Sequence, residues 1–435
     1  MRQLVFLYLA TINLQDTLLR MYYGNIAGSP LHIGLVLKGG MTCLLGIYLL
    51  AKLFNDRVDL RNIFVICMLL FFVYGLFQFV VIEIAVFKMK YIYPAANLLI
   101  KIASYLLTAF YVFQNAAYFR SKLNLIIGLN VTAVLMNVIF GYYFKLGWLS
   151  YKAIPDSYRG FLAGNDTSIF SALAFGYGLY LLQKHKWIAM LILAASLISM
   201  YIISTKAIFG ASVFVALYML HKEKKQSGVR ATHISKMIIL FIVFLTAAFI
   251  YSREEISERV FRIYTSSVET SIERIEDSDR YPSWLLGAAY ISPVRVLIAY
   301  DMLTVLFSDD IEFVLFGYGP GGIYERFRRP PMMDLFNILG FYGWFGFFLL
   351  YVPQFLLILS ILKMRNFDLK DSLFLAMFLY GAFGGFLFAS ANTSIIYGFV
   401  SGLLWFSASG FQTYRKCIIF SPVVRLPNKK VVRYG

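Results

Sequence analysis

The residues best suited to chemistry lie in a glycine- and arginine-rich segment, LFGYGPGGIYERFRR, at positions 315–329. Arg326 and Arg328 supply forked guanidinium donors that match phosphate oxygens bidentately. Glycine permits positive φ and close backbone approach. The glycines expected to form the turn are Gly317, Gly319 and Gly321. The segment therefore predicts either a phosphate-binding turn or a structural turn followed by a solvated basic end.

Ionisable residues also fall within or beside long apolar runs of the chain. Lys38 lies about two turns into the second run, Glu83 near the end of the third and Lys101 near the middle of the fourth. A charge inside a membrane needs a partner or a watery cavity. Glu83 and Lys101 could form a structural pair. Alternatively, an anionic ligand would gather these cations with Arg159 and Lys206, which we expect on the same face.

Metal-dependent chemistry has little support in the sequence. The four histidines are not spaced to hold a metal or to pair with a nucleophile on the long polar loop. The three cysteines lie in apolar runs or in the C-terminal tail, so they offer neither a disulfide framework nor a C-x-x-C site. We expect no metal site and no cofactor. Any chemistry outside the membrane would use carboxylates, arginine or lysine.

The elements that must position these residues are membrane helices. Of 435 residues, 60% are hydrophobic and 14% are charged, against about 25% charged in a soluble domain. Apolar runs of about 18 residues or more are long enough to cross a membrane as helices, whereas a β-barrel would show short alternating segments. We expect an all-α polytopic protein with about twelve spans, at 4–19, 32–53, 62–87, 91–114, 123–144, 167–183, 187–204, 206–221, 237–251, 336–361, 372–390 and 393–411.

The distribution of charge predicts the orientation. The formal net charge is +17, but lysine and arginine concentrate in the segments that face the cytoplasm if the N-terminus is inside, as the positive-inside rule requires. The loop 252–335 contains no lysine and is acidic overall. We therefore expect both termini in the cytoplasm, the loop outside, and no nucleic-acid partner.

This orientation divides the chain into parts: helices 1–9 at 1–251, the external loop at 252–335, helices 10–12 at 336–411 and a basic tail at 412–435. Within the loop, the apolar stretch 284–307 contains a proline, an arginine and an aspartate, whose charges would be costly in a membrane. We expect it to form an amphipathic helix packed on the membrane domain.

Four motifs, in order, resemble the O-antigen polymerase and O-antigen ligase superfamily of bacterial inner membranes. They are GNDTSIFSALAFG at 164–176, STKAIFGAS at 204–212, LFGYGPG at 315–321 and MMDLFNILGFYGWFG at 332–346. The family also has an arginine before its glycine-rich turn, for which Arg280 and Arg295 compete. Its ligases have a histidine where this chain reads RRPPMMD, which favours a polymerase. Two further acidic positions of the polymerases are occupied by Arg329 and Pro331.

The resemblance implies a metal-independent glycosyltransferase that polymerises polyprenyl-diphosphate-linked repeat units at the outer face of the inner membrane. Asp334 or Asp166 would be the base, and arginines and lysines would hold the diphosphate: Arg326, Arg328, Arg295, Arg280, Arg159 and Lys206. The implied partners are the lipid-linked donor and acceptor and membrane lipid, with a chain-length regulator protein as a further candidate. A flippase or other transporter, a ligase and a structural envelope subunit are the alternatives.

The orientation is tested with single cysteines in a chain whose Cys43, Cys67 and Cys417 are replaced by alanine. We expect Ser278→Cys to react with a membrane-impermeant thiol reagent in intact cells, and Lys225→Cys to react only after the membrane is opened, because lysine-rich loops stay inside. Labelling of both from outside would contradict the assignment.

Overall fold

The computed structural model describes the greater part of the chain. The described residues are 1–23, 33–55, 62–86, 90–149, 158–162, 164–182, 185–203, 212, 293–308, 311–327, 333–363, 368–383, 388 and 390–420. These residues are almost entirely helical, with two isolated β-bridges in the loop after residue 143. The predicted all-α class is therefore confirmed.

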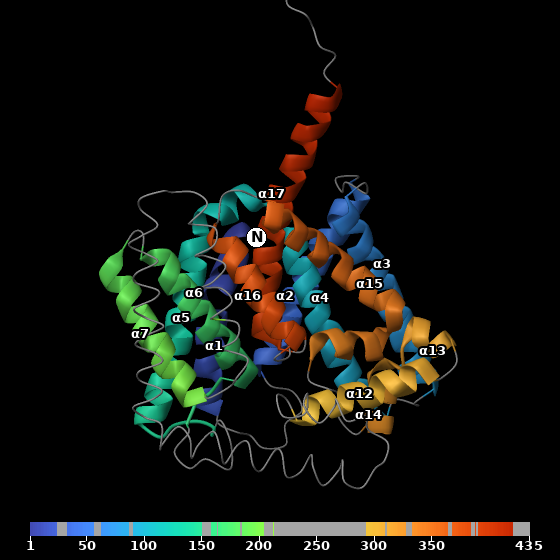
Figure 1. Ribbon diagram of the computed structural model, residues 1–435, viewed down its shortest axis with the longest axis horizontal. Helices are drawn as coiled ribbons and strands as arrows, with labels where there is room; N and C mark the ends of the chain where they lie inside the picture. The colour runs from blue at the N-terminus through green and yellow to red at the C-terminus, as the bar shows by residue number, and fades with distance from the viewer. Residues whose placement is uncertain are drawn as a thin grey trace, which may run out of the picture.

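The helices, in chain order, are α1 (Arg2–Tyr23), α2 (Ile33–Phe54), α3 (Ile63–Gln78) with its π-helical continuation η1 (Phe79–Val86), α4 (Ile92–Gln114), α5 (Ala116–Tyr143), α6 (Gly164–Leu181), α7 (Lys186–Ile203), α12 (Pro293–Ser308), α13 (Ile311–Phe316), α14 (Gly319–Phe327), α15 (Asp334–Lys363), α16 (Leu369–Phe383) and α17 (Ala391–Phe420). Figure 1 shows the N-terminus and the C-terminal part of α17 at one end of the bundle, with α12 and α14 at the other.

Among the described residues, six helices are long and apolar enough to cross a membrane: Val36–Phe54, Ile63–Ile82, Ile92–Gln114, Ala116–Tyr143, Lys186–Ile203 and Asp334–Lys363. The chain is thus a helical membrane protein. Four other predicted spans overlap α1, α6, α16 and α17. The predicted spans 206–221, apart from residue 212, and 237–251 lie outside the described residues. The number of twelve spans stays a prediction, as does the external loop, of which the structure describes α12, α13 and α14.

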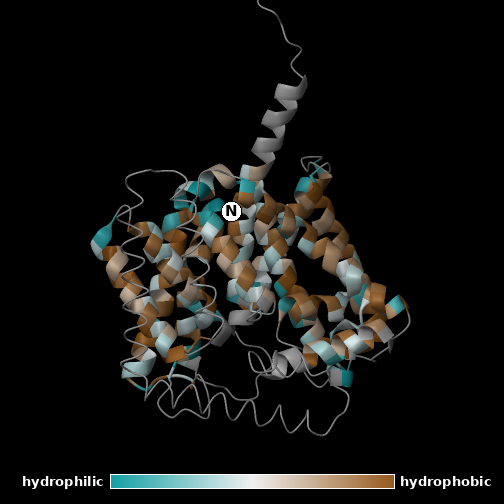
Figure 2. Cartoon of the chain, viewed as in Figure 1, coloured by the Kyte–Doolittle hydropathy of each residue, from teal (hydrophilic) through white to brown (hydrophobic). Residues whose placement is uncertain are grey.

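The surface of the bundle suits contact with lipid. Large apolar side chains are exposed on α2, α3, α7 and α15, for example Ile47, Val73, Leu191 and Phe348. Figure 2 shows hydrophobic residues along the flanks of the molecule and paler, more polar residues in the middle, around α17. Lipid solvates such an apolar exterior as water would not, so the arrangement places polar groups inside.

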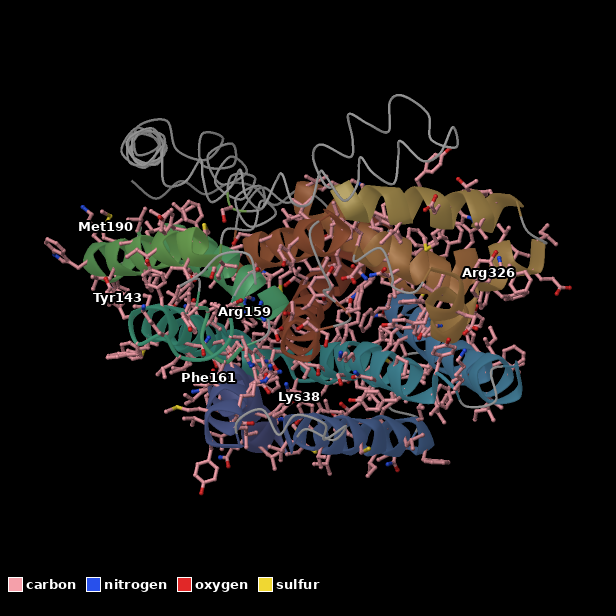
Figure 3. The ribbon with its side chains drawn as sticks, turned by 90° about the horizontal axis from the view of Figure 1, so that it is seen from below. Lys38, Tyr143, Arg159, Phe161, Met190 and Arg326 are labelled. Carbon is pink, nitrogen blue, oxygen red and sulfur yellow. The ribbon has the colours of Figure 1, made fainter. Side chains whose placement is uncertain are left out.

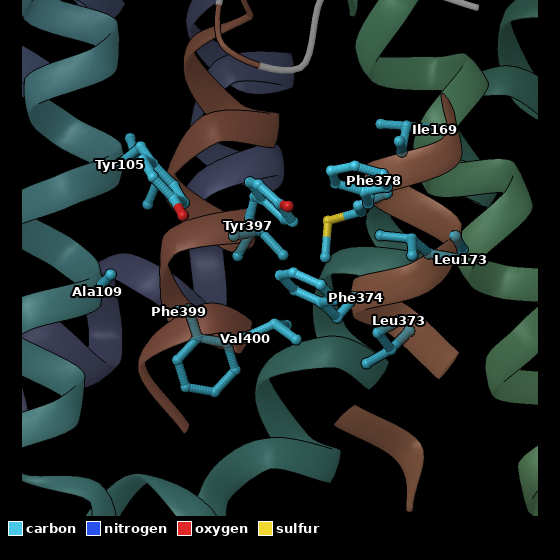
Figure 4. Packing of buried hydrophobic residues seen from close by; sticks show 14 of the residues in the cluster. Tyr105, Ala109, Ile169, Leu173, Leu373, Phe374, Phe378, Tyr397, Phe399 and Val400 are labelled. Carbon is cyan, nitrogen blue, oxygen red and sulfur yellow. The ribbon is translucent and has the colours of Figure 1, made fainter. Parts of the chain in front are cut away.

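Helices α4 and α17 form the centre of the packing, and small residues make their contact close. A Cβ added to Gly398 would collide with the carbonyl oxygen of Tyr105, and one added to Gly402 would collide with that of Ala109. Their four-residue spacing is the small-residue pattern by which membrane helices approach each other closely. Beside these glycines the Tyr397 ring stacks on Tyr105, at a centroid distance of 5.1 Å (Figure 4).

Helix α15 is broken near its start, although the sequence predicts one continuous span at 336–361. Gly343 has φ 60° and ψ −169°, which separates a short segment, Asp334–Tyr342, from the long part that follows. Gly317, in the turn between α13 and α14, has φ 77° and lies so close to Gly343 that a Cβ on either would strike the other's backbone nitrogen. Both positions require glycine.

Polar side chains of α3 bind the backbone groups that this break leaves free. The Tyr74 hydroxyl lies 2.6 Å from the carbonyl oxygen of Phe316 and 2.9 Å from that of Tyr342. The Gln78 amide donates to Phe316 and Phe341 carbonyls at 2.7 and 2.6 Å. Because lipid cannot satisfy backbone groups, these contacts are what permit irregular backbone here.

An exposed ion pair connects α14 to the start of α4. Lys90 Nζ donates to Glu325 Oε2 at 2.7 Å, and the Tyr91 hydroxyl donates to the same oxygen. The Lys90 ammonium first, and the Tyr91 hydroxyl second, lower the pKa of the Glu325 carboxyl. A carboxyl with a lowered pKa contributes its stabilisation above its ordinary pKa and loses it as the pH falls through the folded value. Acid therefore weakens this connection.

The contact between α4 and α17 is tested by adding one methyl group. We expect Gly398→Ala to destabilise the purified protein by about 1–3 kcal/mol, because the new Cβ meets backbone rather than a movable side chain. Thermal unfolding in detergent micelles measures this. Gly39→Ala in α2 is the matched control, since among the described residues no neighbouring side chain or other helix comes within 4 Å of its added Cβ. Equal melting temperatures for the two variants would contradict the packing.

Candidate functional site

A cluster of charged side chains lies inside the bundle, centred on Asp16 of α1. Its Oδ1 accepts from Lys38 Nζ of α2 at 3.1 Å, and its Oδ2 forms an ion pair with Arg20 Nη2 at 3.2 Å. The same Oδ2 accepts from Asn392 Nδ2 of α17 at 3.3 Å. The Asp16 side chain is 4% exposed and that of Lys38 is 10% exposed. Buried charges persist only when paired and hydrogen-bonded, so this carboxylate fixes two cations in place.

A ladder of amides supports the cluster from three helices. Asn392 Nδ2 donates to Asn13 Oδ1 at 2.9 Å, and Asn13 Nδ2 donates to Asn130 Oδ1 of α5, also at 2.9 Å. The Asn130 amide then donates to the carbonyls of Leu9 and Ile126 at 2.7 and 2.9 Å. These bonds hold α1 between α5 and α17, because each amide is satisfied only if its neighbour is present.

The loop after α5 brings a further guanidinium to this region. Trp148 and Arg159 pair through the bond from Arg159 N to Trp148 O at 2.9 Å. Asn137 of α5 fixes the turn, since its Nδ2 donates to the Arg159 carbonyl at 3.0 Å. The Trp148 ring lies 5.0 Å from Arg20 Cζ and 6.0 Å from Arg159 Cζ. One indole therefore contacts both guanidinium groups through cation–π interactions.

A fourth cation comes from α4. Lys101 lies within electrostatic range of Asp166, Lys38 and Arg20. In Figure 3 Lys38, Arg159 and Phe161 lie near one another, and the Arg20 guanidinium reaches the Phe161 carbonyl at 3.5 Å. We define the cation cluster as Arg20, Lys38, Lys101 and Arg159. With Asp16 and Asp166 included, its formal charge is +2, which suits a bound anion such as a phosphate group.

The two predicted catalytic acids converge on one short segment before and at the start of α17. Asp334 is 2% exposed, and its Oδ2 accepts from the backbone N–H of Phe388 at 3.1 Å. Asp166, in the first turn of α6, is 3% exposed. Its Oδ1 accepts from the hydroxyls of Ser390 and Thr393, the latter at 2.7 Å. The tertiary structure thus brings together carboxylates that are far apart in the sequence.

The structure does not bring Arg326 to the cation cluster. Arg326 lies at the exposed end of α14, where its guanidinium contacts Tyr318, with Nη1 3.2 Å from the hydroxyl and Cζ 4.5 Å from the ring centroid. Figure 3 shows it near one edge of the molecule, well away from Lys38 and Arg159. Helix α14 packs against α15 and α4, and the predicted role of Arg326 in binding the diphosphate stays a prediction.

The remaining predicted residues divide into two groups. Gly317 and Gly319 have φ of 77° and 70°, whereas Gly321 lies within helix α14. The positions on which the structure describes no side chain are Arg280, Arg295, Arg328, Lys206 and Glu83. For two of these residues the structure describes the backbone: Arg295 belongs to α12 and Glu83 to η1. Within the described ranges, no group of three histidine, cysteine or acidic residues is close enough to hold a metal ion.

Sequence reasoning missed Asp16 and Arg20, the centre of the cluster. A signal was present: the two charges stand four residues apart in an otherwise apolar run, the spacing of an ion pair on one helix face. Asn392 carried no comparable signal, because an asparagine near a helix start also suits a simple cap.

Neither the models of known protein families nor the curated proteins give a match to this chain.

The Asp16–Lys38 pair predicts a ranked series of stabilities. We expect Asp16→Asn to cost about 5 kcal/mol, since it leaves the buried Lys38 and the partly exposed Arg20 without their carboxylate. Lys38→Met should cost about 3 kcal/mol, since Arg20 still faces Asp16. The double variant should recover part of the loss. Unfolding in detergent micelles gives the coupling free energy between the two sites.

The exposed pair Lys90–Glu325 is the control for this series. Lys90→Met should leave the stability nearly unchanged, because solvent screens an exposed pair. If Lys38→Met and Lys90→Met were equally mild, Asp16 and Lys38 would not form a buried pair.

Proposed function

We propose that the protein is a membrane glycosyltransferase that polymerises polyprenyl-diphosphate-linked oligosaccharide units at the outer face of a bacterial inner membrane, as the motif resemblance implies. The observation that carries the proposal is the cation cluster. It lies within a helical membrane protein, and together with Asp16 and Asp166 it has a formal charge of +2. A lipid diphosphate is an anion that reaches such a site from the membrane itself. The glycan could belong to an O-antigen, a capsule or an exopolysaccharide.

The location of the cluster supports an outer-face reaction. Asp16 lies late in α1, while Lys38 and Asp166 lie early in α2 and α6. If the N-terminus is cytoplasmic, all three lie in the outer half of the bundle. The end of the molecule that carries α12 and α14 is on the same side, as expected for a cap over the site (Figure 1).

In the proposed reaction, a hydroxyl of the acceptor sugar attacks the anomeric carbon of the donor glycan. The new glycosidic C–O bond forms as the C–O bond to the diphosphate breaks, and polyprenyl diphosphate leaves. Arginine and lysine of the cation cluster stabilise the negative charge that develops on the leaving group, which is commonly the largest catalytic contribution. Asp334 or Asp166 takes the hydroxyl proton.

One observation favours a second candidate, a lipid-linked oligosaccharide flippase. Transporters build binding sites around broken membrane helices, and α15 is broken at Gly343. The same break serves a transferase by turning Asp334 toward the start of α17. The two candidates differ in their product: only the transferase makes a longer glycan.

Incubation of the purified protein with a lipid-linked repeat unit tests the function, and we expect a ladder of lengthened glycans. Lys101→Met and Arg159→Gln should each slow chain lengthening about 10²- to 10³-fold, because each removes a preorganised cation from the site of developing charge. Asp334→Asn should lower the rate of chain lengthening by about 10²- to 10⁴-fold if Asp334 is the base. Gel electrophoresis of the glycan products measures these rates.

Two surface variants are the controls. Arg326→Lys and Glu312→Gln alter exposed side chains outside the cation cluster, so both should retain rates within about threefold of the wild type. If Arg326→Lys were slow and Lys101→Met normal, the diphosphate would bind at α14 instead. Absence of any ladder, with movement of the lipid-linked unit across vesicles, would favour the flippase.

A further inference from the structure

The short first part of α15 carries an amide whose hydrogen-bonding groups are unused. Asn337 is 2% exposed, and neither its Nδ2 nor its Oδ1 has a hydrogen-bond partner in the part of the chain that the structure describes. Burial of a polar group without a partner is unfavourable, and such groups are rare in folded proteins. We therefore expect the buried Asn337 amide to form hydrogen bonds with a ligand from outside the protein.

The contrast with Asn130 shows what a structural amide looks like in this bundle. Asn130 is 1% exposed and uses both ends of its amide, accepting from Asn13 Nδ2 and donating to the carbonyls of Leu9 and Ile126. The two asparagines are equally buried in the same protein. Their difference in hydrogen bonding therefore reflects their roles rather than their depth.

Asn337 shares a helix face with a proposed catalytic acid. It follows Asp334 by three residues in a helical segment, so the two side chains lie on neighbouring positions of one face. One turn further on, Gly340 contacts Met302 of α12 and Ile323 of α14, where an added Cβ would collide with the Met302 sulfur. Asp334, Asn337 and Gly340 thus follow one another along this segment, and α12 and α14 cover it at Gly340.

We propose that Asn337 and Asp334 form a subsite for the hydroxyl groups of a neutral sugar. The proposal rests on the proposed glycan transfer for its choice of ligand. An amide supplies two donors and one acceptor, whereas a carboxylate only accepts. A pair of sugar hydroxyls, each of which donates and accepts, matches this combination. A phosphate does not, because the Asp334 carboxylate would repel it.

This subsite complements the cation cluster. The segment 388–393 contacts both acids: Phe388 binds Asp334, while Ser390 and Thr393 bind Asp166, which in turn lies in electrostatic range of Lys101. A glycosyl diphosphate has a neutral sugar joined to an anionic group. Phe388, Ser390 and Thr393 thus link the polar pair on α15 to the acid that lies beside the cation cluster.

The test compares Asn337→Leu with Asn130→Leu in the purified full-length protein. Binding is measured by saturation-transfer NMR with methyl glycosides of neutral hexoses and N-acetylhexosamines as probes. We expect Asn337→Leu to weaken binding of these probes about tenfold or more, since one sugar hydroxyl loses its partner. Its melting temperature should equal or exceed that of the wild type, because leucine removes an unsatisfied amide. Asn130→Leu should melt several degrees lower.

A second variant, Asn337→Ala, adds no atoms and should show the same loss of binding. The proposal is overturned if Asn337→Leu and Asn337→Ala bind the glycosides as the wild type does, if the wild type binds none of them, or if Asn337→Leu melts as low as Asn130→Leu. Binding that depends on Asn337 without any glycan ladder would overturn the polymerase and leave the sugar subsite standing.

Discussion

The interior of this bundle depends on the ion pairs that the Asp16 carboxylate forms. Hydrocarbon cannot solvate a charge, so the buried Lys38 is tolerated inside because it faces Asp16, which also pairs with the partly exposed Arg20. Its third contact, from Asn392, brings in α17 and through the amide ladder α5. One side chain thus determines how helices from the two ends of the chain meet, and loss of any partner leaves another group unpaired.

Helix α17 is held by two kinds of contact with different physical origins. Gly398 and Gly402 let its backbone approach α4, so dispersion forces fix the separation of the helices. Asn392 and Thr393, one to two turns earlier, fix its rotation and register, because hydrogen bonds inside a membrane are directional and have no competing water. Phe388, Ser390 and Thr393 thereby hydrogen-bond to the carboxylates of Asp334 and Asp166.

The break in α15 has a similar logic. A continuous helix would carry Asp334 along the direction of the long span, whereas the turn at Gly343 gives the segment Asp334–Tyr342 an orientation of its own (Figure 1). The freed carbonyls would be costly in lipid, and Gln78 and Tyr74 satisfy them. The protein therefore combines an apolar exterior with irregular backbone inside the bundle.

The sequence alone determined the class of this protein and most helix ranges, because apolar runs of sufficient length have no other stable form in a membrane. It also singled out Lys38 and Arg159 by residue type and position, and Asp166 and Asp334 through the motif resemblance. Only the tertiary structure decided which of these meet. Asp16 lies 22 residues from Lys38 and 376 residues from Asn392 in the sequence. These contacts follow from helix packing, which a local sequence pattern does not reveal. The break at Gly343 was also not predicted, since a straight helix and a broken helix can have the same apolar sequence pattern.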